Sequence, residues 1–299
     1  MTAISTLREH RVGLWTGALE SLPAPQLLET VAEIEALGFG SLWFGEAYGR
    51  ESLTTALALT GATEHLVVGT GIANIYARGA MATAAGARLI ETLAPGRFVL
   101  GLGVSHLPLV ERDRGATYLP PIQAMTDYLD AMDRAPYFGA DGDLPPMVLA
   151  ALGPKMLALS RQRTAGAHPY LVTPAHTSRA RQTLGRGPLL VVEQAAVLNQ
   201  HRSEALRRAH EHLNIYTGLP NYRNSWLRQG FTEDDFVRGG SERLADALVV
   251  QGDVAVLRKR IDEHLHAGAD HVCVQVLGHD LGEVPFEAWR ELGPAVAEA

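Results

Sequence analysis

The stretch that decides the fold runs from residue 66 to residue 106 and reads as strand, turn, helix and strand. It opens with LVVGTGIANIY (66–76), continues through an alanine-rich segment (78–93) and ends with FVLGLGVSH (98–106). Both strand-like runs are too apolar to have a wet face, which favours a parallel sheet covered on both sides. The segment therefore predicts a βαβ unit. Small residues at its strand ends let a planar ligand approach the backbone.

The same alternation continues along the chain. We predict strands at Val12–Leu19, Ser41–Gly45, Leu66–Asn74, Phe98–Val104, Met147–Leu152, Ala167–Val172, Leu189–Ala195 and Val272–Val276. Eight βα repeats without a domain break predict one α/β domain over residues 1–299, a (β/α)8 TIM barrel. The stretch 201–252 interrupts the pattern and predicts a long helical insertion between strands seven and eight. An insertion there fits a cover over the barrel mouth or a subunit contact.

Composition and charge narrow the range of partners. The net charge is −7 and the basic residues are scattered, which argues against a nucleic-acid or anionic-membrane surface. No run of 18 apolar residues suggests a membrane span, and the N-terminus lacks the apolar core of a signal peptide. Cys273 is the sole cysteine, so an intramolecular disulfide is impossible. We expect a cytoplasmic protein whose partner is a small-molecule substrate.

Barrel enzymes place their active sites at the carboxyl ends of the strands. The polar and glycine candidates at or near those ends are Glu46, Asn74, Ser105, His106, Gly153, His168, Tyr170, Thr173, Glu193 and Gln194. His106 stands out because it directly follows a strand that ends in Gly-Val-Ser. No metal site is expected, because the sequence has neither an HExxH motif nor a cysteine cluster. The glycines at 101 and 103 lack the third glycine and following helix of a dinucleotide fingerprint.

Three segments together resemble the bacterial luciferase-like superfamily: GTGIAN (69–74), PGRFVLGLG (95–103) and AALGP (150–154). The similarity extends from about Val12 to Gly278. Within the superfamily the chain looks most like the deazaflavin (coenzyme F420)-dependent oxidoreductases.

The resemblance implies roles for matched positions. Members carry a non-prolyl cis peptide behind the central ring of the flavin, and the matching bond here is Gly71–Ile72. Asn74 would lie near the ring edge. The backbone amides of Gly103, Val104, Ser105 and Gly153 match positions that hold the cofactor phosphate. His168 is the remaining candidate contact for the cofactor.

One departure from the family pattern concerns the chemistry. The sugar-phosphate dehydrogenase of this branch has an Asp-His pair after strand two and a glutamate after strand four. The matched residues here are Gly45-Glu46 and His106. We therefore do not carry over the sugar-phosphate substrate. His106 and Glu46 are the candidates to move or stabilise the proton that accompanies hydride transfer.

Three functions remain open on the sequence. The leading one is an F420-dependent oxidoreductase that transfers a hydride between coenzyme F420 and a small organic substrate. The alternative is an FMN-dependent monooxygenase that works with a partner flavin reductase, and the third is a non-catalytic flavin-binding barrel. Small residues surround the helix between Ala80 and Ala87, which lets another backbone come close. With the family resemblance, this predicts a homodimer through the helices after strands one to three.

Overall fold

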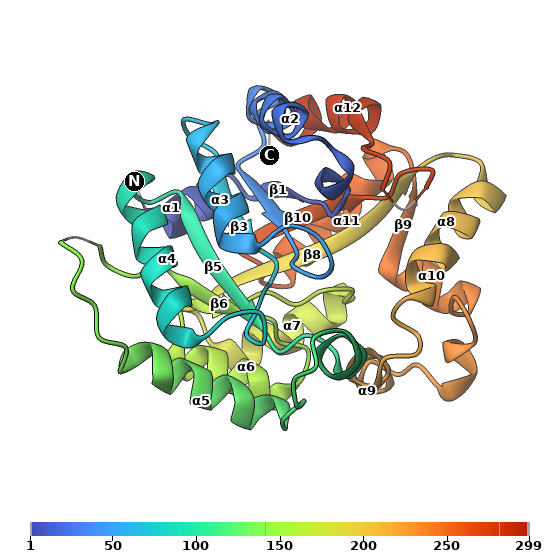
Figure 1. The fold of residues 1–299 in the computed structure, drawn as a ribbon. Coiled ribbons are helices and arrows are strands. Elements are labelled where there is room, and N and C mark those ends of the chain that lie inside the picture. Colours follow the sequence, from blue (N-terminus) through green and yellow to red (C-terminus); the bar gives the residue numbers. More distant parts are fainter. Residues whose placement is uncertain (1, 141, 281, 298–299) are drawn as a thin grey trace.

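A computed structural model describes residues 2–140, 142–280 and 282–297 of the chain. Its strands are β1 (Val12–Trp15), β2 (Ser41–Phe44), β3 (Val67–Thr70), β4 (Ala73–Asn74), β5 (Phe98–Gly103), β6 (Met147–Leu149), β7 (Gly166–Ala167), β8 (Leu189–Leu198), β9 (Val249–Gly252) and β10 (His271–Val276). The barrel strands follow the order β10, β1, β2, β3, β5, β6, β7, β8, and a parallel pairing of β8 with β10 closes the ring. The predicted (β/α)8 barrel is confirmed (Figure 1).

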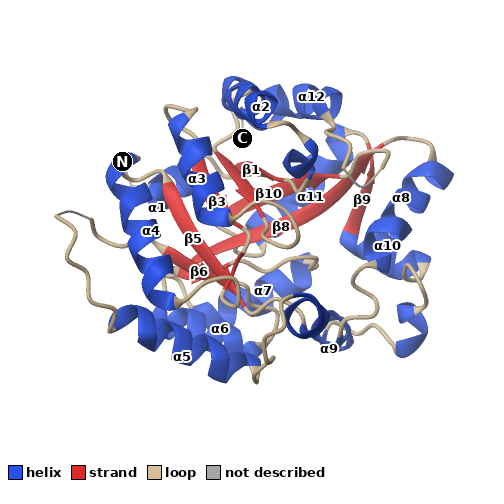
Figure 2. Ribbon diagram, viewed as in Figure 1, coloured by secondary structure: helices blue, strands red, loops and turns tan. Residues whose placement is uncertain are grey.

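Helices surround this ring, as Figure 2 shows. They are α1 (Ala3–Glu9), α2 (Ala24–Ala36), α3 (Ser52–Gly61), α4 (Ala80–Leu93), α5 (Pro121–Asp133), α6 (Pro154–Arg163), α7 (Pro174–Leu184), α8 (Arg202–Asn214), α9 (Pro220–Arg228), α10 (Glu242–Leu248), α11 (Val254–His266) and α12 (Phe286–Ala297). Shorter turns are the 3-10 helices η1 (Ala18–Ser21) and η3 (Glu233–Phe236) and the π-helix η2 (Pro108–Asp113). In the described part of the chain, no helix is long and apolar enough to cross a membrane.

Large and small side chains fill the barrel together. Trp43, Val67, Val99 and Cys273 share one buried cluster with Leu7, which comes from α1. Alternate residues of a strand face opposite sides, so inward residues from several strands can meet in this way. A Cβ at Gly69 would lie only 2.4 Å from the Trp43 ring, so glycine is required where that ring sits. The α1 helix was not predicted. It has only seven residues, which is too short for the spacing of apolar residues to show a helical period.

Several predicted strands are shorter or broken in the structure, among them the fifth, which was predicted as Met147–Leu152 but ends at Leu149. The third divides into β3 and β4 around a cis peptide at Gly71–Ile72, the bond that the family resemblance indicated. The sixth was predicted as Ala167–Val172, but pairing stops at Ala167. Pro169 lacks a backbone donor and Leu171 has a φ of 52°, so the chain turns away from the sheet. The first ends at Trp15, where the chain turns into η1.

The predicted insertion is present, with one correction. Residues 201–252 form α8, α9, η3 and α10, but they end in a strand rather than a helix. Strand β9 pairs in parallel with Ala195–Leu198, so β8 also extends past its predicted end at Ala195. The insertion has its own core, in which Trp226 and Phe236 pack against Leu171. In Figure 1, α8 and α10 stand beside the end of β8, while α9 lies next to α7.

Candidate active site

A cavity of about 820 Å³ opens at the carboxyl ends of the barrel strands. Segments after β2, β3, β5, β6 and β7 line it, and so does the start of α9. Among the predicted site residues, its lining includes Glu46, Gly71, Ile72, Gly103, Val104, Ser105, His106, Gly153 and His168. Asn74 is the exception, because it is fully buried behind this wall. Predicted residues from five separate segments of the sequence therefore meet around one space.

The floor of the cavity is bare backbone flanked by two rings. A Cβ at Gly71 would lie 2.5 Å from Trp15 Nε1 and 2.8 Å from His168 Nε2, so no side chain fits there. Trp15 Nε1 donates to the Gly71 carbonyl at 3.1 Å. His168 Nδ1 lies 3.0 Å from the Val191 carbonyl, which can only accept, so this nitrogen carries the proton. His168 Nε2 is then a buried acceptor without a partner among the described residues.

Burial keeps the His168 ring neutral. It lowers the pKa of His168 to about 4, and the hydrogen bond to Val191 opposes that shift only in part. The ring also stacks on Trp43, with centroids 4.9 Å apart and planes inclined by 28°. A neutral, fixed ring with a free lone pair can accept a hydrogen bond from an N–H or O–H of a bound molecule.

One end of the cavity is suited to an anion. The Ser105 backbone has a φ of 55°, and Gly153 is the N-cap of α6. Unpaired backbone N–H groups at a helix N-terminus favour a negative group. Lys155 and Arg228 line the same end, and a Cβ at Gly153 would lie 3.6 Å from Arg228 Nη2. This end therefore combines backbone donors with two cations.

His106 lies on the cavity wall beside the insertion. Its ring centroid is 5.7 Å from that of Tyr222. Burial lowers the pKa of His106 below its ordinary value, and a hydrogen bond with the Asn221 side chain opposes this shift. The imidazole is therefore neutral near pH 7, the form that can accept a proton.

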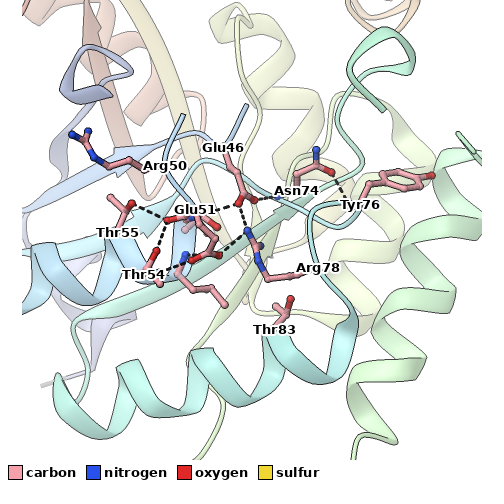
Figure 3. Close-up of polar contacts among 12 residues, drawn as sticks. Glu46, Arg50, Glu51, Thr54, Thr55, Asn74, Tyr76, Arg78 and Thr83 are labelled. Atoms are coloured by element: carbon pink, nitrogen blue, oxygen red, sulfur yellow. Dashed lines mark hydrogen bonds and ion pairs between the residues drawn. The ribbon is translucent and has the colours of Figure 1, made fainter. Parts of the chain in front are cut away.

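Glu46 is held in a network of donors (Figure 3). Its carboxylate forms an ion pair with Arg78 and accepts hydrogen bonds from the backbone N–H of Asn74 at 2.8 Å and of Ser52 at 3.2 Å. The Glu46 backbone N–H donates to the Ile72 carbonyl at 3.1 Å. Glu46 thus joins the end of β2 to the segment from Ile72 to Asn74 and to the start of α3. Both of its carboxylate oxygens already have donors.

Arg78 also pairs with a second carboxylate. Its Nη2 lies 2.7 Å from Glu51 Oε1, and Glu51 in turn caps α3 by accepting from the N–H groups of Leu53 and Thr54. The Arg78 side chain is 12% exposed and that of Glu46 is 4% exposed, whereas that of Glu51 is 41% exposed. Figure 3 shows Arg78 pointing between the two carboxylates. The Arg78–Glu46 pair is the buried part of this network.

The insertion supplies an aromatic wall. Tyr216 and Tyr222 lie with ring centroids 4.8 Å apart, and Tyr170 completes the group at 5.5 Å from Tyr216. The Tyr216 hydroxyl donates to the Tyr170 hydroxyl at 3.1 Å, which donates to Gln275 Oε1 at 2.6 Å. Trp15 closes the group from the barrel side, 5.2 Å from Tyr170. The predicted role of residues 201–252 as a cover over the mouth is consistent with this wall.

Two candidate residues in β8, the seventh predicted strand, do not line the cavity. These are Glu193 and Gln194, which are both fully buried. Burial raises the pKa of Glu193 to about 8, although its hydrogen bond from the Leu171 N–H opposes the shift. Over the described ranges, no group of three His, Cys, Asp or Glu side chains could hold a metal ion.

We compared this chain with known protein families and with proteins of known structure. The sequence pattern of the luciferase-like monooxygenases matches residues 2–262. The chain belongs to this family. A Mycobacterium tuberculosis protein provisionally named a coenzyme F420-dependent oxidoreductase is 26% identical over an alignment covering 84% of this chain and 90% of that protein.

Solved structures show the same luciferase-like fold. An F420-dependent secondary alcohol dehydrogenase in complex with an F420-acetone adduct superposes with a TM-score of 0.73 at 14% identity, covering 96% of this chain and 98% of that one. The oxygenating constituent of 3,6-diketocamphane monooxygenase from Pseudomonas putida, in complex with FMN, superposes with a TM-score of 0.68 at 14% identity. That match covers 95% of this chain and 96% of the other.

Sequence reasoning missed part of the luciferase-like site. Tyr118, Lys155, Asn221, Tyr222 and Arg228 line the cavity but were not predicted. Lys155 directly follows the predicted segment 150–154, so the helix start there was an available signal. The turn-rich segment 218–224 pointed toward Asn221 and Tyr222, but its position over the mouth depends on tertiary packing.

Proposed function

We propose that this protein is an F420-dependent oxidoreductase that transfers a hydride between coenzyme F420 and a small organic substrate. The observation that carries the proposal is the convergence of the predicted cofactor and proton-transfer residues on one cavity. The similarity to the provisionally named F420-dependent oxidoreductase, over most of both chains, supports the choice of cofactor. The likeness to solved structures supports the fold alone, since both F420 and FMN occur among them.

The residues present suit a flat ring with a phosphate-bearing chain. Gly71 lines the cavity with backbone alone, and the His168 lone pair can accept from a ring N–H. Gly153, Lys155 and Arg228 offer donors and positive charge to the phosphate. When bound, the deazaflavin supplies the carbon that accepts or gives the hydride. The chain itself orients the substrate, excludes water and moves the proton.

His106 is the group that we assign to proton transfer. As a neutral imidazole it takes a proton from the substrate when hydride leaves, and it returns that proton in the opposite direction. Asn221 holds the ring from the insertion side. The aromatic wall of Tyr170, Tyr216 and Tyr222 carries no charge of its own at neutral pH, so it suits an uncharged organic substrate.

In this proposal Glu46 supports the reaction indirectly, by holding the cavity floor in place. Its carboxylate oxygens accept from Arg78, Asn74 and Ser52, so its contacts favour the holding of the cavity floor. The segment from Ile72 to Asn74 passes directly along that floor. We therefore assign Glu46 a positioning role. Its earlier assignment to proton transfer remains a prediction that kinetics can test.

Cofactor binding is the first test. In a fluorescence titration, F420 should bind at least about tenfold more tightly than FMN, which corresponds to about 1.4 kcal/mol. Binding of FMN at micromolar concentration without binding of F420 would favour the monooxygenase with its partner reductase. Tight binding of F420 without hydride transfer to any carbonyl, alcohol or alkene in a substrate panel would favour a non-catalytic barrel.

Assembly as a homodimer is also part of the proposal, and the structure changes how it should be tested. Ala84 and Ala87 of the small-residue run are buried against the barrel. The outer face of α4 instead exposes Met81, Leu89 and Leu93, which are 59%, 49% and 62% exposed. An apolar helix face of this kind is suited to a second copy across a two-fold axis.

Leu89→Arg should convert the dimer into monomers without loss of the fold, because its side chain is half exposed. Light scattering at micromolar concentration measures the change. Gln162→Arg on α6, an exposed position on a helix outside the predicted interface, is the control and should stay dimeric. A monomer for the unmodified protein would refute the dimer.

A further inference from the structure

Glu193 is a buried acid that the proposed chemistry leaves unused. It lies in β8, in register with Cys273 of β10. Alternate residues of a strand face the same side, so Glu193 points the same way as Leu189 and Val191, which belong to the buried cluster inside the barrel. The side chain is fully buried and does not line the cavity. Glu193 therefore acts from the barrel interior, without contact to a bound substrate.

The carboxyl group of Glu193 has a single hydrogen-bond donor. Its Oε2 accepts from the Leu171 backbone N–H at 2.8 Å, and its Oε1 has no partner among the described residues. The titratable side chains around it supply no cation, because burial lowers the pKa of the histidines to about 4 and raises the pKa of the tyrosines and the cysteine. These side chains are His168, His212, Tyr170, Tyr216, Tyr222 and Cys273. A buried carboxylate with one donor and no cation is costly, so Glu193 keeps its proton at neutral pH.

Leu171 connects this acid to the insertion. Its φ of 52° is a left-handed conformation, which a leucine adopts only where contacts hold it. From the barrel side, Glu193 Oε2 accepts from the Leu171 N–H, and the Glu193 N–H donates to the Pro169 carbonyl at 3.1 Å. From the other side, Trp226 Nε1 donates to the Leu171 carbonyl at 3.1 Å. Leu171 thus joins β8 to α9 through both of its backbone polar groups.

Trp226 continues the connection toward His106. It is fully buried on α9, and its ring centroid lies 5.7 Å from that of Tyr222, one turn earlier on the same helix. The Tyr222 ring in turn lies 5.7 Å from the ring of His106 on the cavity wall. A shift of α9 would move Tyr222 and the neighbouring Asn221 together. The cover over His106 therefore depends on how α9 docks on Leu171.

We propose that Glu193 is a positioning residue for His106, because as a hydrogen-bond acceptor inside the barrel it fixes Leu171 in the conformation on which Trp226 docks α9. The inference rests on the proposed function only in giving His106 the role of the base. A neutral acid suits this task, since its carbonyl oxygen accepts from Leu171 without leaving a charge buried. The acceptor at position 193 should matter and its negative charge should not.

The test compares Glu193→Leu with Glu193→Gln in the full-length protein. Leucine leaves the Leu171 N–H buried and unpaired, so amide hydrogen exchange of residues 220–228 should become about tenfold faster, as measured by mass spectrometry. The pKa of His106, followed by NMR of its imidazole, should rise toward the ordinary value of about 6.5, because burial under α9 no longer lowers it. Glutamine keeps an acceptor for Leu171, so both quantities should match those of the unmodified protein.

Glu35→Leu is the matched control. Glu35 of α2 also accepts from a backbone N–H, that of Leu66 at 2.7 Å, but it does so before β3 and therefore at the opposite end of the barrel from the cavity. This variant should lower the free energy of unfolding without changing the exchange of residues 220–228 or the pKa of His106. Trp226→Phe breaks the next link and leaves the barrel interior intact. It should reproduce both effects of Glu193→Leu, and it tests the connection even if that variant fails to fold.

The proton on Glu193 permits a separate measurement. Burial raises its pKa in the folded protein to about 8, above the value of about 4.3 expected in the unfolded chain. Between these values the folded state binds more protons than the unfolded state. Stability to urea, relative to that of Glu193→Gln, should therefore fall as pH rises from about 4.3 to about 8 and stay constant above that range. A difference that does not change with pH would overturn the neutral acid.

Two further outcomes would overturn the positioning role. In the first, Glu193→Leu and Trp226→Phe lower stability but leave the exchange of α9 and the pKa of His106 unchanged, so that Glu193 only fills the core. In the second, Glu193→Gln loosens α9 as much as Glu193→Leu does, so that the acceptor is not the cause. None of these measurements needs cofactor or turnover. A failure of the F420-dependent function would therefore appear in the cofactor titration and leave these results unaffected.

Discussion

His106→Ala should reduce kcat by about 100-fold or more, because the variant loses the group that accepts and returns the substrate proton. The affinity for the cofactor should change little, since the ring binds the insertion residue Asn221 rather than the cavity floor. Steady-state kinetics with an assayed substrate and a separate cofactor titration measure the two effects. His65→Ala, at an exposed position, is the control and should keep full turnover.

The pH profile gives an independent check on His106. Burial lowers its pKa, so the folded protein keeps a neutral ring to a lower pH than an exposed histidine does. If the neutral ring is the base, activity is present above this pKa and is lost as pH falls through it. The acidic limb of kcat/KM should therefore lie below the ordinary histidine value of about 6.5. It should disappear in His106→Ala, and added imidazole should restore part of the turnover. Unaltered turnover in the variant would remove His106 from the mechanism.

The barrel could be predicted because its signals are local. Parallel strands buried on both faces must be apolar along their whole length, and the segment 98–103 shows this directly. The ends of such strands converge by topology, so Ser105, His106 and Gly153 could be placed together without knowledge of any contact. Helix caps carry a local signal too: aspartate is a preferred N-cap residue, and Asp253 accepts from the Val256 N–H at 3.0 Å at the start of α11.

The parts of the site and fold that the sequence did not predict depend on contacts between segments far apart in the chain. Arg78 and Glu46 are 32 positions apart, and no local pattern shows that they pair. Tyr222 and Arg228 reach the cavity because α9 docks on the loop after β7, where Trp226 Nε1 donates to the Leu171 carbonyl at 3.1 Å. That docking follows from side-chain packing in the insertion core, which has no periodic signature in the sequence. Strand β9 was missed for a related reason: four residues are too few to separate a strand from the end of a helix.

The Arg78–Glu46 pair should carry a large share of the stability of the cavity floor. Arg78→Ala leaves the Glu46 carboxylate buried without its cation, and removal of one partner from a buried pair costs about 3–5 kcal/mol. We expect a loss of this size in the free energy of unfolding, measured by urea denaturation. Affinity for the cofactor should fall as well, because Glu46 holds the backbone of Asn74 and Ile72.

Arg163→Ala is the matched control, since Arg163 also bridges two carboxylates, Asp130 and Asp133, but does so near the surface. Arg163→Ala should lower the free energy of unfolding by less than about 1 kcal/mol. In the double variant Arg78→Met with Glu46→Gln, the uncompensated charge is gone, so the loss should be smaller than that of Arg78→Ala alone. If Arg78→Ala instead matched Arg163→Ala in stability and retained normal cofactor affinity, Glu46 would not need its cation. Its positioning role at the cavity floor would then fail.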